Sequence, residues 1–319
     1  MKLIIQIPCY NEEKTLPATL TDLPRSLDGV DTVEWLVIDD GSQDSTVEIA
    51  KLHGVDHIVR HPRNLGLARA FSTGLDTCLQ LGADIIVNTD ADKQYHAGDI
   101  PALIAPVLAG QADIVVGARP VGSIQHFSPT KKVLEKFGSW VVRMISNTDI
   151  PDAPSGFRAI SRTAAQQLVV FNDYTYTLET IIQAGQKKMA ITWVPIRVNE
   201  DLRPSRLVKS IPSYIKRNMI TIIRIFVVYK PFFFFGSIGS ILFGTGVLIG
   251  LRFLWFFVNG QGQGHIQSLI FAGVLLGMGF QTFLIAFIAD LLAANRKLLE
   301  DMRYGMRKMS HRPGGKDEG

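Results

Sequence analysis

The chain has 319 residues, 47% of them hydrophobic and 19% charged, with a formal net charge of +4. This length allows one large domain with an appendage, or two domains. The hydrophobic fraction is high for a purely soluble protein, and the excess is concentrated in two stretches near the C-terminus. Because basic residues cluster beside those stretches, the positive charge indicates attraction to a membrane surface and argues against a nucleic-acid partner.

Short apolar runs alternate with helical patterns over the first two hundred residues. The apolar runs barely alternate with polar residues, which is typical of strands buried on both faces. Strands are predicted at KLIIQIP, EWLVIDD, HIVRH, ADIIVNTD and ADIVVGAR, with a late strand at ITWVPIRVNED. Helices are predicted at KTLPATLTDLPRSL, STVEIAKLHG, GLARAFSTGLDTCLQLG, IPALIAPVLAG, KVLEKFGSWVVRMISN and around TLETIIQAGQ. This repetition predicts the α/β class, with a mainly parallel, doubly wound sheet.

Polar clusters follow three of the predicted strands: CYNEE after the first, DDGSQDST after the second and DADKQ after the fourth. Ligands of parallel sheets bind at the carboxyl ends of the strands, so these clusters mark the predicted functional site. No G-x-G-x-x-G follows the first strand and no G-x-x-x-x-G-K-[ST] occurs in the sequence. The dinucleotide-binding and P-loop interpretations therefore lose their main support.

The sharpest motif is Asp90-Ala91-Asp92, directly after the fourth strand. Two carboxylates so close together repel each other, and a hard divalent cation such as Mg²⁺ or Mn²⁺ removes that repulsion. Such an ion can bind a diphosphate and neutralise its charge as it leaves, and Gln94 offers a third oxygen. A D-x-D pair alone is a weak signal, because most such pairs are solvated turn residues. Its place after a buried strand strengthens the prediction.

The clusters after the first two strands offer groups for a nucleotide. Tyr10 can stack on a base and Glu12 can bind ribose hydroxyls, next to Pro8 at the strand end; the alternative is a helix N-terminus capped by Asn11. Paired acids after the second strand can accept hydrogen bonds from a nucleobase. The alternative there is a turn in which Asp44 or Ser45 caps the next helix.

Two C-terminal stretches, about residues 232–258 and 268–290, reach the ~20 apolar residues needed to cross a bilayer. The alternative is a pair of buried helices in a soluble core. Lys and Arg flank the pair and are absent from the loop NGQGQGHIQ, which predicts that both ends are cytoplasmic. Residues 211–230 are predicted to form amphipathic juxtamembrane helices, and residues 293–319 a basic cytoplasmic segment.

Seven motifs occur in an order that resembles family 2 glycosyltransferases of the GT-A fold: PCYNEE, VIDDGSQDST, RNLGLARA, DADKQ, GAR, DAPSGFRAISR and RPSRLVKS. They are most similar to the branch that makes polyprenyl-phosphate sugars, such as dolichyl-phosphate mannose synthases. The resemblance covers about residues 1–210, which it implies to be the catalytic domain, and the C-terminal pair of spans is similar to that of membrane-anchored bacterial members.

The resemblance implies a role for each matching position. The nucleotide and donor set is Pro8, Tyr10, Glu12, Asp39, Asp40, Asp90, Ala91 and Arg203. The metal set is Asp90, Asp92 and Gln94, and the catalytic set is Asp92, Asp152 and Arg119. The sugar and acceptor pocket is Ser155, Gly156, Arg158, Arg206 and Lys209. Two alternatives stay open: Arg206 and Lys209 as membrane-surface charge, and Arg158 as half of a structural ion pair.

The implied activity is inverting transfer of a hexose from a UDP- or GDP-sugar to undecaprenyl or dolichyl phosphate on the cytoplasmic face of the inner membrane. The implied cofactor is Mg²⁺ or Mn²⁺, and the glycine-rich spans favour a homo-oligomer. Three alternatives are weighed: transfer to a non-lipid acceptor, a polysaccharide synthase, and an inactive scaffold. The sequence has no Q-x-x-R-W motif and two spans, which argues against the synthase, and Asp90 and Asp92 argue against the scaffold.

Overall fold

The computed structural model describes residues 1–120, 138–170, 176–199 and 220–310, apart from residues 141, 221, 222, 225 and 261. Its contacts divide the chain into two units. One comprises Met1–Asn218 with Asp301–Gly319, and the other comprises Met219–Glu300. Each unit is described by itself.

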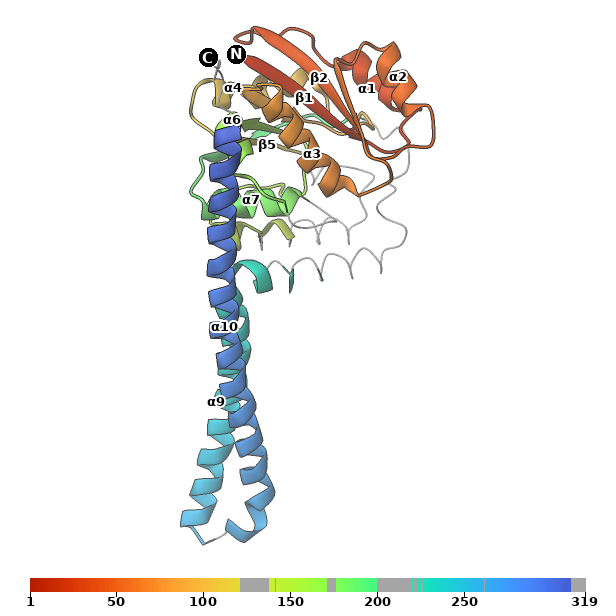
Figure 1. Cartoon of the computed structure of the whole chain (residues 1–319). Helices are drawn as coiled ribbons and strands as arrows, with labels where there is room; N and C mark the ends of the chain where they lie inside the picture. The colour runs from red at the N-terminus through yellow and green to blue at the C-terminus, as the bar shows by residue number, and fades with distance from the viewer. Residues whose placement is uncertain are drawn as a thin grey trace. The chain divides into compact units, whose positions relative to one another are not determined.

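The first unit is built on a mixed sheet (Figure 1). In the described part of the chain it has seven strands in the order β3-β2-β1-β4-β6-β5-β7. Their bounds are β1 (Lys2–Cys9), β2 (Thr32–Asp39), β3 (His57–Arg60), β4 (Ile85–Asn88), β5 (Ile114–Ala118), β6 (Arg158–Ser161) and β7 (Ile191–Pro195). Strand β6 is antiparallel to β4 and β5, and the other pairs are parallel. The mainly parallel sheet is confirmed.

Helices cover both faces of this sheet, as a doubly wound fold requires. They are α1 (Leu16–Asp22), α2 (Thr46–Leu52), α3 (Leu67–Gln80), the short η1 (Ala97–Asp99), α4 (Ile100–Leu108), α6 (Arg162–Gln167) and α7 (Thr177–Gln186). Helices α1 and α4 share a hydrophobic core with Leu3, Ile5 and Ile7 of β1. Helix α3 packs on the other face, where Gly74 lies so close to Gln6 that a Cβ would clash.

The strand order reverses between β1 and β4, because β2 and β3 lie on one side of β1 and β4 on the other. Such a switch point opens a crevice at the carboxyl ends of the strands. The β1–β4 pairing ends at Gln6 and Asn88, before Pro8. Proline has no N–H to donate, so its place beyond the last β1–β4 pair leaves no ladder bond unmade on that side.

Strand β6 was not among the predicted strands. It has four residues, RAIS, too few for a period to be recognised. Its antiparallel direction has a functional consequence, since its first residue, Arg158, pairs with Asn88 at the end of β4. The residues just before β6 are therefore at the same edge of the sheet as the residues just after β4.

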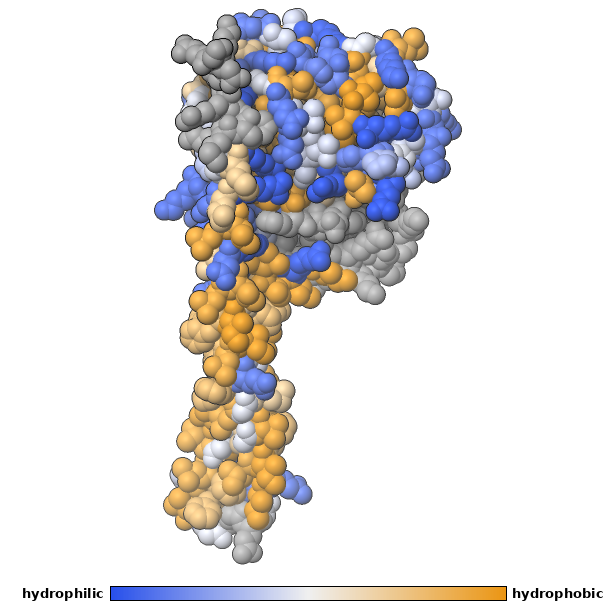
Figure 2. Space-filling model, in the orientation of Figure 1, coloured by the Kyte–Doolittle hydropathy of each residue, from blue (hydrophilic) through white to orange (hydrophobic). Residues whose placement is uncertain are grey.

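The second unit contains α9 (Pro231–Val258), η2 (Gly262–His265) and most of α10 (Ile266–Ser310). Both long helices are apolar enough to cross a membrane, by length and composition. Their exposed side chains are largely apolar (Figure 2). A Cβ on Gly279 would lie 2.7 Å from the backbone nitrogen of Phe243, so glycine permits the close approach of the two helices.

Helix α10 continues well past residue 290, where the second predicted span ends, and its last turns belong to the first unit. Within that unit, Arg307 forms a 2.6 Å ion pair with Asp76 of α3. Arg307 also donates a 2.6 Å hydrogen bond to the carbonyl of Leu168, just after α6. Of the predicted juxtamembrane helices, residues 220, 223–224 and 226–229 are helical, and most of the segment lies outside the described residues.

Candidate functional site

The loops after β1 and β2 are joined to each other by hydrogen bonds. The Asn11 N–H donates to Ser42 Oγ over 2.9 Å, and the Gln43 N–H donates to Asn11 Oδ1 over 2.8 Å. The Glu12 N–H donates to Thr46 Oγ1 over 2.8 Å. Asn11 has φ +55°, a left-handed conformation that asparagine tolerates. The two polar clusters thus form one continuous wall beside the switch point.

Helix capping accounts for only part of these two polar clusters. Helix α1 begins at Leu16 after Thr15, so Asn11 does not cap it. Asp44 does accept a 3.1 Å hydrogen bond from the N–H of Thr46, the first residue of α2. Tyr10 is 39% exposed, whereas Glu12 is buried and accepts a 2.6 Å hydrogen bond from the Thr15 hydroxyl.

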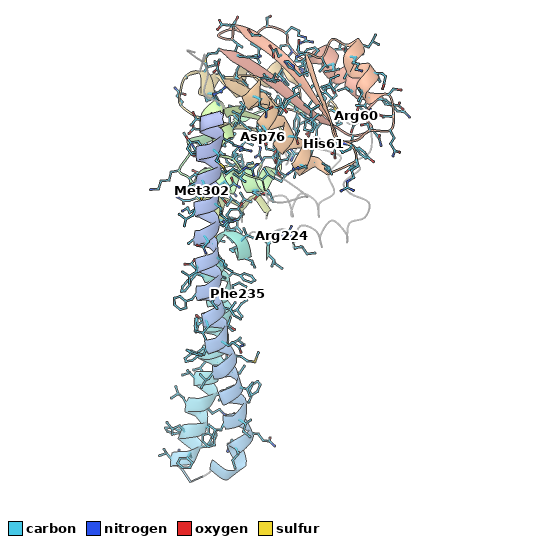
Figure 3. The ribbon with its side chains drawn as sticks, viewed as in Figure 1. Arg60, His61, Asp76, Arg224, Phe235 and Met302 are labelled. Atoms are coloured by element: carbon cyan, nitrogen blue, oxygen red, sulfur yellow. The ribbon has the colours of Figure 1, made fainter. Side chains whose placement is uncertain are left out.

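Asp39 is fully buried at the end of β2, and its two oxygens differ in their partners. Oδ1 accepts a 2.9 Å hydrogen bond from the Ser42 N–H. Oδ2 lies 3.0 Å from Nε of Arg60, at the end of β3 (Figure 3), but accepts no hydrogen bond within the described residues. Because a buried oxygen without a hydrogen bond is costly, Oδ2 is suited to accept one from a ligand N–H.

Asp40 has a different environment, although it is the next residue. Its Oδ1 lies 2.7 Å from His61 Nδ1 and accepts a 2.9 Å hydrogen bond from the Leu65 N–H. Its Oδ2 accepts a 2.8 Å hydrogen bond from the Gly66 N–H. Both oxygens therefore fix the loop that begins α3. These contacts favour a supporting role for Asp40, in place of the predicted contact with a nucleobase.

Asp90 and Asp92 lie in the loop after β4. Burial, followed by the negative charge of Asp92, raises the pKa of Asp90 to about 7. Asp92 Oδ1 accepts a 3.2 Å hydrogen bond from the Gln94 N–H, and Lys93 between them has φ +61°. The chain therefore turns sharply here, and the loop holds Asp90 in a setting that disfavours its charge. Ala91 is buried, and its carbonyl accepts a hydrogen bond from Thr19.

The two aspartates fit a divalent cation of the magnesium type. Among the described residues, no third His, Cys, Asp or Glu joins them as a metal-binding group. An ion bound here must complete its coordination with water and with ligand oxygens, as Mg²⁺ commonly does. Burial and then the charge of Asp92 raise the pKa of Asp90, and a cation would offset both effects. Gln94 as a third oxygen ligand stays a prediction.

Arg119 and Asp152 form a buried, bidentate ion pair. Arg119 Nε lies 2.8 Å from Asp152 Oδ2, and Nη2 lies 3.0 Å from Oδ1. The Arg119 N–H adds a third hydrogen bond of 3.0 Å to Oδ2. Arg119 thus occupies both oxygens of Asp152. The geometry therefore favours Asp152 as the residue that orients Arg119, over Asp152 as a general base.

The segment before β6 is braced by Arg158, whose side chain is fully buried. Arg158 donates 2.9 Å hydrogen bonds to the carbonyls of Ser155 and Ala153, and it also contacts the Thr180 hydroxyl. Burial lowers its pKa to about 10. These contacts favour an internal brace, in place of the predicted wall of the acceptor pocket or an ion pair. The Ser155 hydroxyl is buried and has no hydrogen-bond partner in the described part of the chain.

A buried polar network beneath the site was missed by the sequence analysis. Asn88 donates 2.8 Å and 2.9 Å hydrogen bonds to the Gly156 carbonyl and the Tyr176 hydroxyl, and it accepts one of 2.8 Å from Gln6. The Gly156 N–H donates to the Tyr95 hydroxyl over 2.9 Å. The available signal was polar residues, Gln6 and Asn88, inside strands that are buried on both faces.

The three basic residues predicted to close over the donor, Arg203, Arg206 and Lys209, lie outside the described residues. The segment just before them is described. The Asn199 side chain donates hydrogen bonds of 2.9 Å and 3.3 Å to the carbonyls of Lys93 and Tyr95. The Asn199 N–H donates to the Gln94 carbonyl over 2.9 Å. The chain after β7 therefore holds the loop of the two aspartates.

Comparisons with known proteins identify the family and the fold. A model of glycosyl transferase family 2 matches residues 4–169. The chain is 31% identical over 212 residues to a UDP-N-acetylglucosamine–dolichyl-phosphate N-acetylglucosaminyltransferase of Methanococcus voltae, covering 60% of this chain and 83% of that protein. It is 27% identical over 218 residues to an undecaprenyl-phosphate mannosyltransferase of Micrococcus luteus, covering 65% and 88%.

Among solved structures, glucosyl-3-phosphoglycerate synthase from Mycobacterium tuberculosis is similar with a TM-score of 0.55 and 20% identity, covering 69% of this chain and 79% of that one. This likeness supports the GT-A type of fold. The family model spans more than half of the chain, including the ends of β1, β2 and β4. The chain therefore belongs to glycosyl transferase family 2, and the protein is a glycosyltransferase.

Proposed function

We propose that the protein transfers a hexose from a UDP- or GDP-sugar to a polyprenyl phosphate such as undecaprenyl or dolichyl phosphate. One observation carries the proposal: a single chain combines this site with two helices that are apolar enough to cross a membrane. The site residues meant here are the buried Asp39 and the ion pair of Arg119 with Asp152 at one edge of the sheet. The relatives named for dolichyl-phosphate and undecaprenyl-phosphate transfer support a lipid acceptor.

The donor nucleotide binds, in this proposal, against the wall formed by the loops after β1 and β2. Asp39 Oδ2 accepts a hydrogen bond from a base N–H, because it has none within the described residues. Tyr10, which is 39% exposed, offers a ring for stacking. Asp40 supports this wall from behind through its loop contacts.

The proposed metal ligands are Asp90 and Asp92, with Gln94 as a third. A divalent cation held there supplies charge neutralisation for the diphosphate. A structure of the mycobacterial synthase, which shares the fold at 20% identity, contains Mn²⁺ and UDP. Burial and the nearby charge of Asp92 together raise the pKa of Asp90, which supports a cation independently of that likeness.

The proposed reaction is a direct displacement. An oxygen of the lipid phosphate forms a bond to the anomeric carbon while the bond from that carbon to the diphosphate oxygen breaks, so the configuration inverts. The nucleoside diphosphate leaves with the electron pair. A phosphate monoester is already anionic at neutral pH, so the attack needs no strong general base. Arg119, oriented by Asp152, stabilises negative charge on the phosphates.

The membrane segments explain how this acceptor is reached. A polyprenyl phosphate presents its phosphate at the headgroup level of a bilayer. The distribution of Lys and Arg around α9 and α10 favours the catalytic unit on the cytoplasmic side. Cytoplasmic orientation, the inner membrane and a homo-oligomer all remain parts of this proposal.

The test is transfer of radiolabelled sugar from UDP- and GDP-sugars into organic-extractable lipid. It uses the full chain with undecaprenyl or dolichyl phosphate, with Mg²⁺, Mn²⁺ or EDTA. We expect label in the lipid phase only with polyprenyl phosphate and a divalent ion, and we expect its loss in Asp92→Asn. Asp31→Asn is the matched control, because Asp31 is exposed and pairs with the N-terminus, at the amino edge of the sheet.

Two outcomes would overturn the lipid acceptor. Transfer without added polyprenyl phosphate, from lipid-free protein, would point to another acceptor. Nucleotide binding without transfer to any lipid would remove the proposed activity, while family membership would stand. Lipid labelling that persists in EDTA would overturn only the proposed dependence on a divalent metal ion.

A further inference from the structure

The hydroxyl of Tyr95 lies where the loop after β4 meets the segment before β6. Tyr95 is 6% exposed, and its ring stacks on Phe157 with centroids 5.1 Å apart and planes 8° apart. The hydroxyl is 2.9 Å from the Gly156 nitrogen, and its interaction with the Asp90 carboxylate lowers the pKa of that group against the raising effects of burial and of Asp92. One buried oxygen therefore contacts both the loop after β4 and the segment before β6.

The direction of each hydrogen bond follows from donor chemistry. A backbone N–H can only donate, so the Tyr95 hydroxyl accepts from Gly156. Its single proton is then available for the carboxylate of Asp90. A hydroxyl that accepts on one side and donates on the other fixes the orientation of the carboxylate without cancelling its charge. The Tyr95 hydroxyl thus favours the charged form of Asp90, against the effects of burial and of Asp92, and restricts its rotamer.

Gly156 is held on its other side as well. Its carbonyl accepts a 2.8 Å hydrogen bond from Asn88, which Gln6 fixes in turn. A Cβ at position 156 would lie 3.2 Å and 3.3 Å from the two Asp90 oxygens and 2.9 Å from the Tyr176 hydroxyl. The backbone of Gly156 and the carboxylate of Asp90 are therefore packed against each other, with Tyr95 bridging them.

The main chain of Tyr95 is fixed independently of its ring. Its carbonyl accepts a hydrogen bond from the Asn199 side chain, and it forms an isolated bridge with Val198. Ring, hydroxyl and backbone are each restrained, so the hydroxyl has little freedom to move away from Asp90. This degree of restraint is expected of a residue that supports a metal ligand.

We propose that Tyr95 is a positioning residue that orients Asp90 for the divalent cation and ties it to the backbone of Gly156 in the acceptor pocket. The proposal rests on the proposed function, which makes the loop of Asp90 the metal site, and on the predicted place of Gly156 in the acceptor pocket. It assigns Tyr95 no contact with the reacting atoms. Removing the hydroxyl alone is expected to weaken cation binding about tenfold or more, as for other groups that orient metal ligands.

The test is direct Mn²⁺ binding to the full chain in detergent, with UDP and separately with GDP, followed by the loss of the free-Mn²⁺ EPR signal. Tyr95→Phe keeps the ring and its stacking on Phe157. We expect its Kd for Mn²⁺ to rise about tenfold or more at a nearly unchanged Tm. In turnover, the KM for metal should rise more than the KM for the nucleotide sugar.

Tyr176→Phe is the comparator. Tyr176 is also a buried tyrosine stacked on a phenylalanine, with ring centroids 3.8 Å apart, and its hydroxyl accepts from Asn88. We expect this variant to lose stability and to keep its Mn²⁺ affinity within about threefold, a discrimination well below the tenfold loss expected for Tyr95→Phe. Equal losses of Mn²⁺ affinity in the two variants would assign the effect to the network as a whole and overturn the specific role of Tyr95.

A second variant keeps the test decisive if Tyr95→Phe does not fold. Gly156→Ala adds the Cβ that would press on the Asp90 oxygens, and its Mn²⁺ affinity should also fall about tenfold. Wild-type affinity in folded Tyr95→Phe or Gly156→Ala, or no Mn²⁺ binding by the wild type, would overturn the proposal. Failure of the lipid acceptor alone would leave these binding results intact, so the two failures are distinguishable.

Discussion

A pair of acidic residues lies at the end of β2 and another lies in the loop after β4, yet Asp40 of the first pair and Asp90 of the second have different environments. Asp40 accepts hydrogen bonds from the Leu65 and Gly66 N–H groups and contacts His61. Asp90 is close to Asp92, and its pKa is raised to about 7 by burial and by that charge. One carboxylate has all its partners within the protein, and the other is held at an electrostatic cost.

These environments distinguish a carboxylate that stabilises the fold from one that serves the reaction more clearly than the sequence motifs do. A carboxylate satisfied by neighbouring N–H groups stabilises a loop and has little left to offer a ligand. A carboxylate that the protein disfavours gains from a cation or a proton, which is typical of functional sites. The comparison predicts that the Asp90–Asp92 pair controls activity and that Asp40 controls stability.

The largest effect is expected from Asp92→Asn. Loss of one of two anionic ligands should lower sugar transfer about a thousandfold, since a bound cation contributes several kcal/mol to charge stabilisation. Initial rates of lipid labelling measure this, with Asp31→Asn as the control. A rate within about tenfold of the wild type would show that the acidic pair is dispensable and would break the comparison.

Asp40→Asn should lower the free energy of unfolding by about 2–3 kcal/mol, because an amide NH₂ cannot accept the hydrogen bonds that the carboxylate accepts. The folded variant should keep its KM for the nucleotide sugar. Thermal melting with initial-rate kinetics tests both parts. A large rise in that KM at an unchanged Tm would restore the contact with a nucleobase that the sequence motif predicted.

The raised pKa of Asp90 predicts a pH dependence of cation binding. Protons and Mn²⁺ compete for this carboxylate, so Mn²⁺ affinity should fall as pH drops below about 7 and level off above it. The slope approaches about tenfold per pH unit for one proton released. Mn²⁺ titrations from pH 5.5 to 8 measure it, and Asp90→Asn should remove the dependence. A flat wild-type profile would contradict the electrostatic account.

The smallest effect concerns stability without metal. Because the folded pKa of Asp90 lies above its ordinary value of 3.8, ionisation costs the native state stability as pH rises from about 4 to 7. Asp90→Asn should therefore stabilise the metal-free protein at pH 8, on the order of 1 kcal/mol, and have no such effect near pH 4. A lower Tm of Asp90→Asn than of the wild type at pH 8 would show that the Asp90 carboxylate stabilises the fold, as is expected for Asp40.

Much of the fold was predictable because its elements are long or strongly patterned. The continuous apolar runs identified β1, β2, β4 and β5, and the helical period identified α3. Strand β6 was missed since four residues carry no period. The predicted end of the second span followed hydropathy, which falls near residue 290, and it did not address the helix, which continues to Ser310 through a mixed polar segment.

The site was predictable at the level of its loops and less so at the level of each side chain. Motif order located Asp39, Asp90 and Asp92 at one sheet edge. It could not reveal that Arg158 is a brace or that Tyr95 lies beside Asp90, because such contacts join residues far apart in sequence. Residues of the same type differ in role according to their hydrogen-bond partners, and those partners cannot be identified from a single sequence.

The catalytic unit is discontinuous along the chain, since Met1–Asn218 is joined by Asp301–Gly319 only after both apolar helices. Arg307, which pairs with Asp76 and donates to the carbonyl of Leu168, is synthesised after both apolar stretches. Proteins begin to fold from the N-terminus during synthesis. The contacts of Arg307 therefore form only after both apolar stretches have been synthesised, so the packing of this unit depends on how those hydrophobic segments are handled.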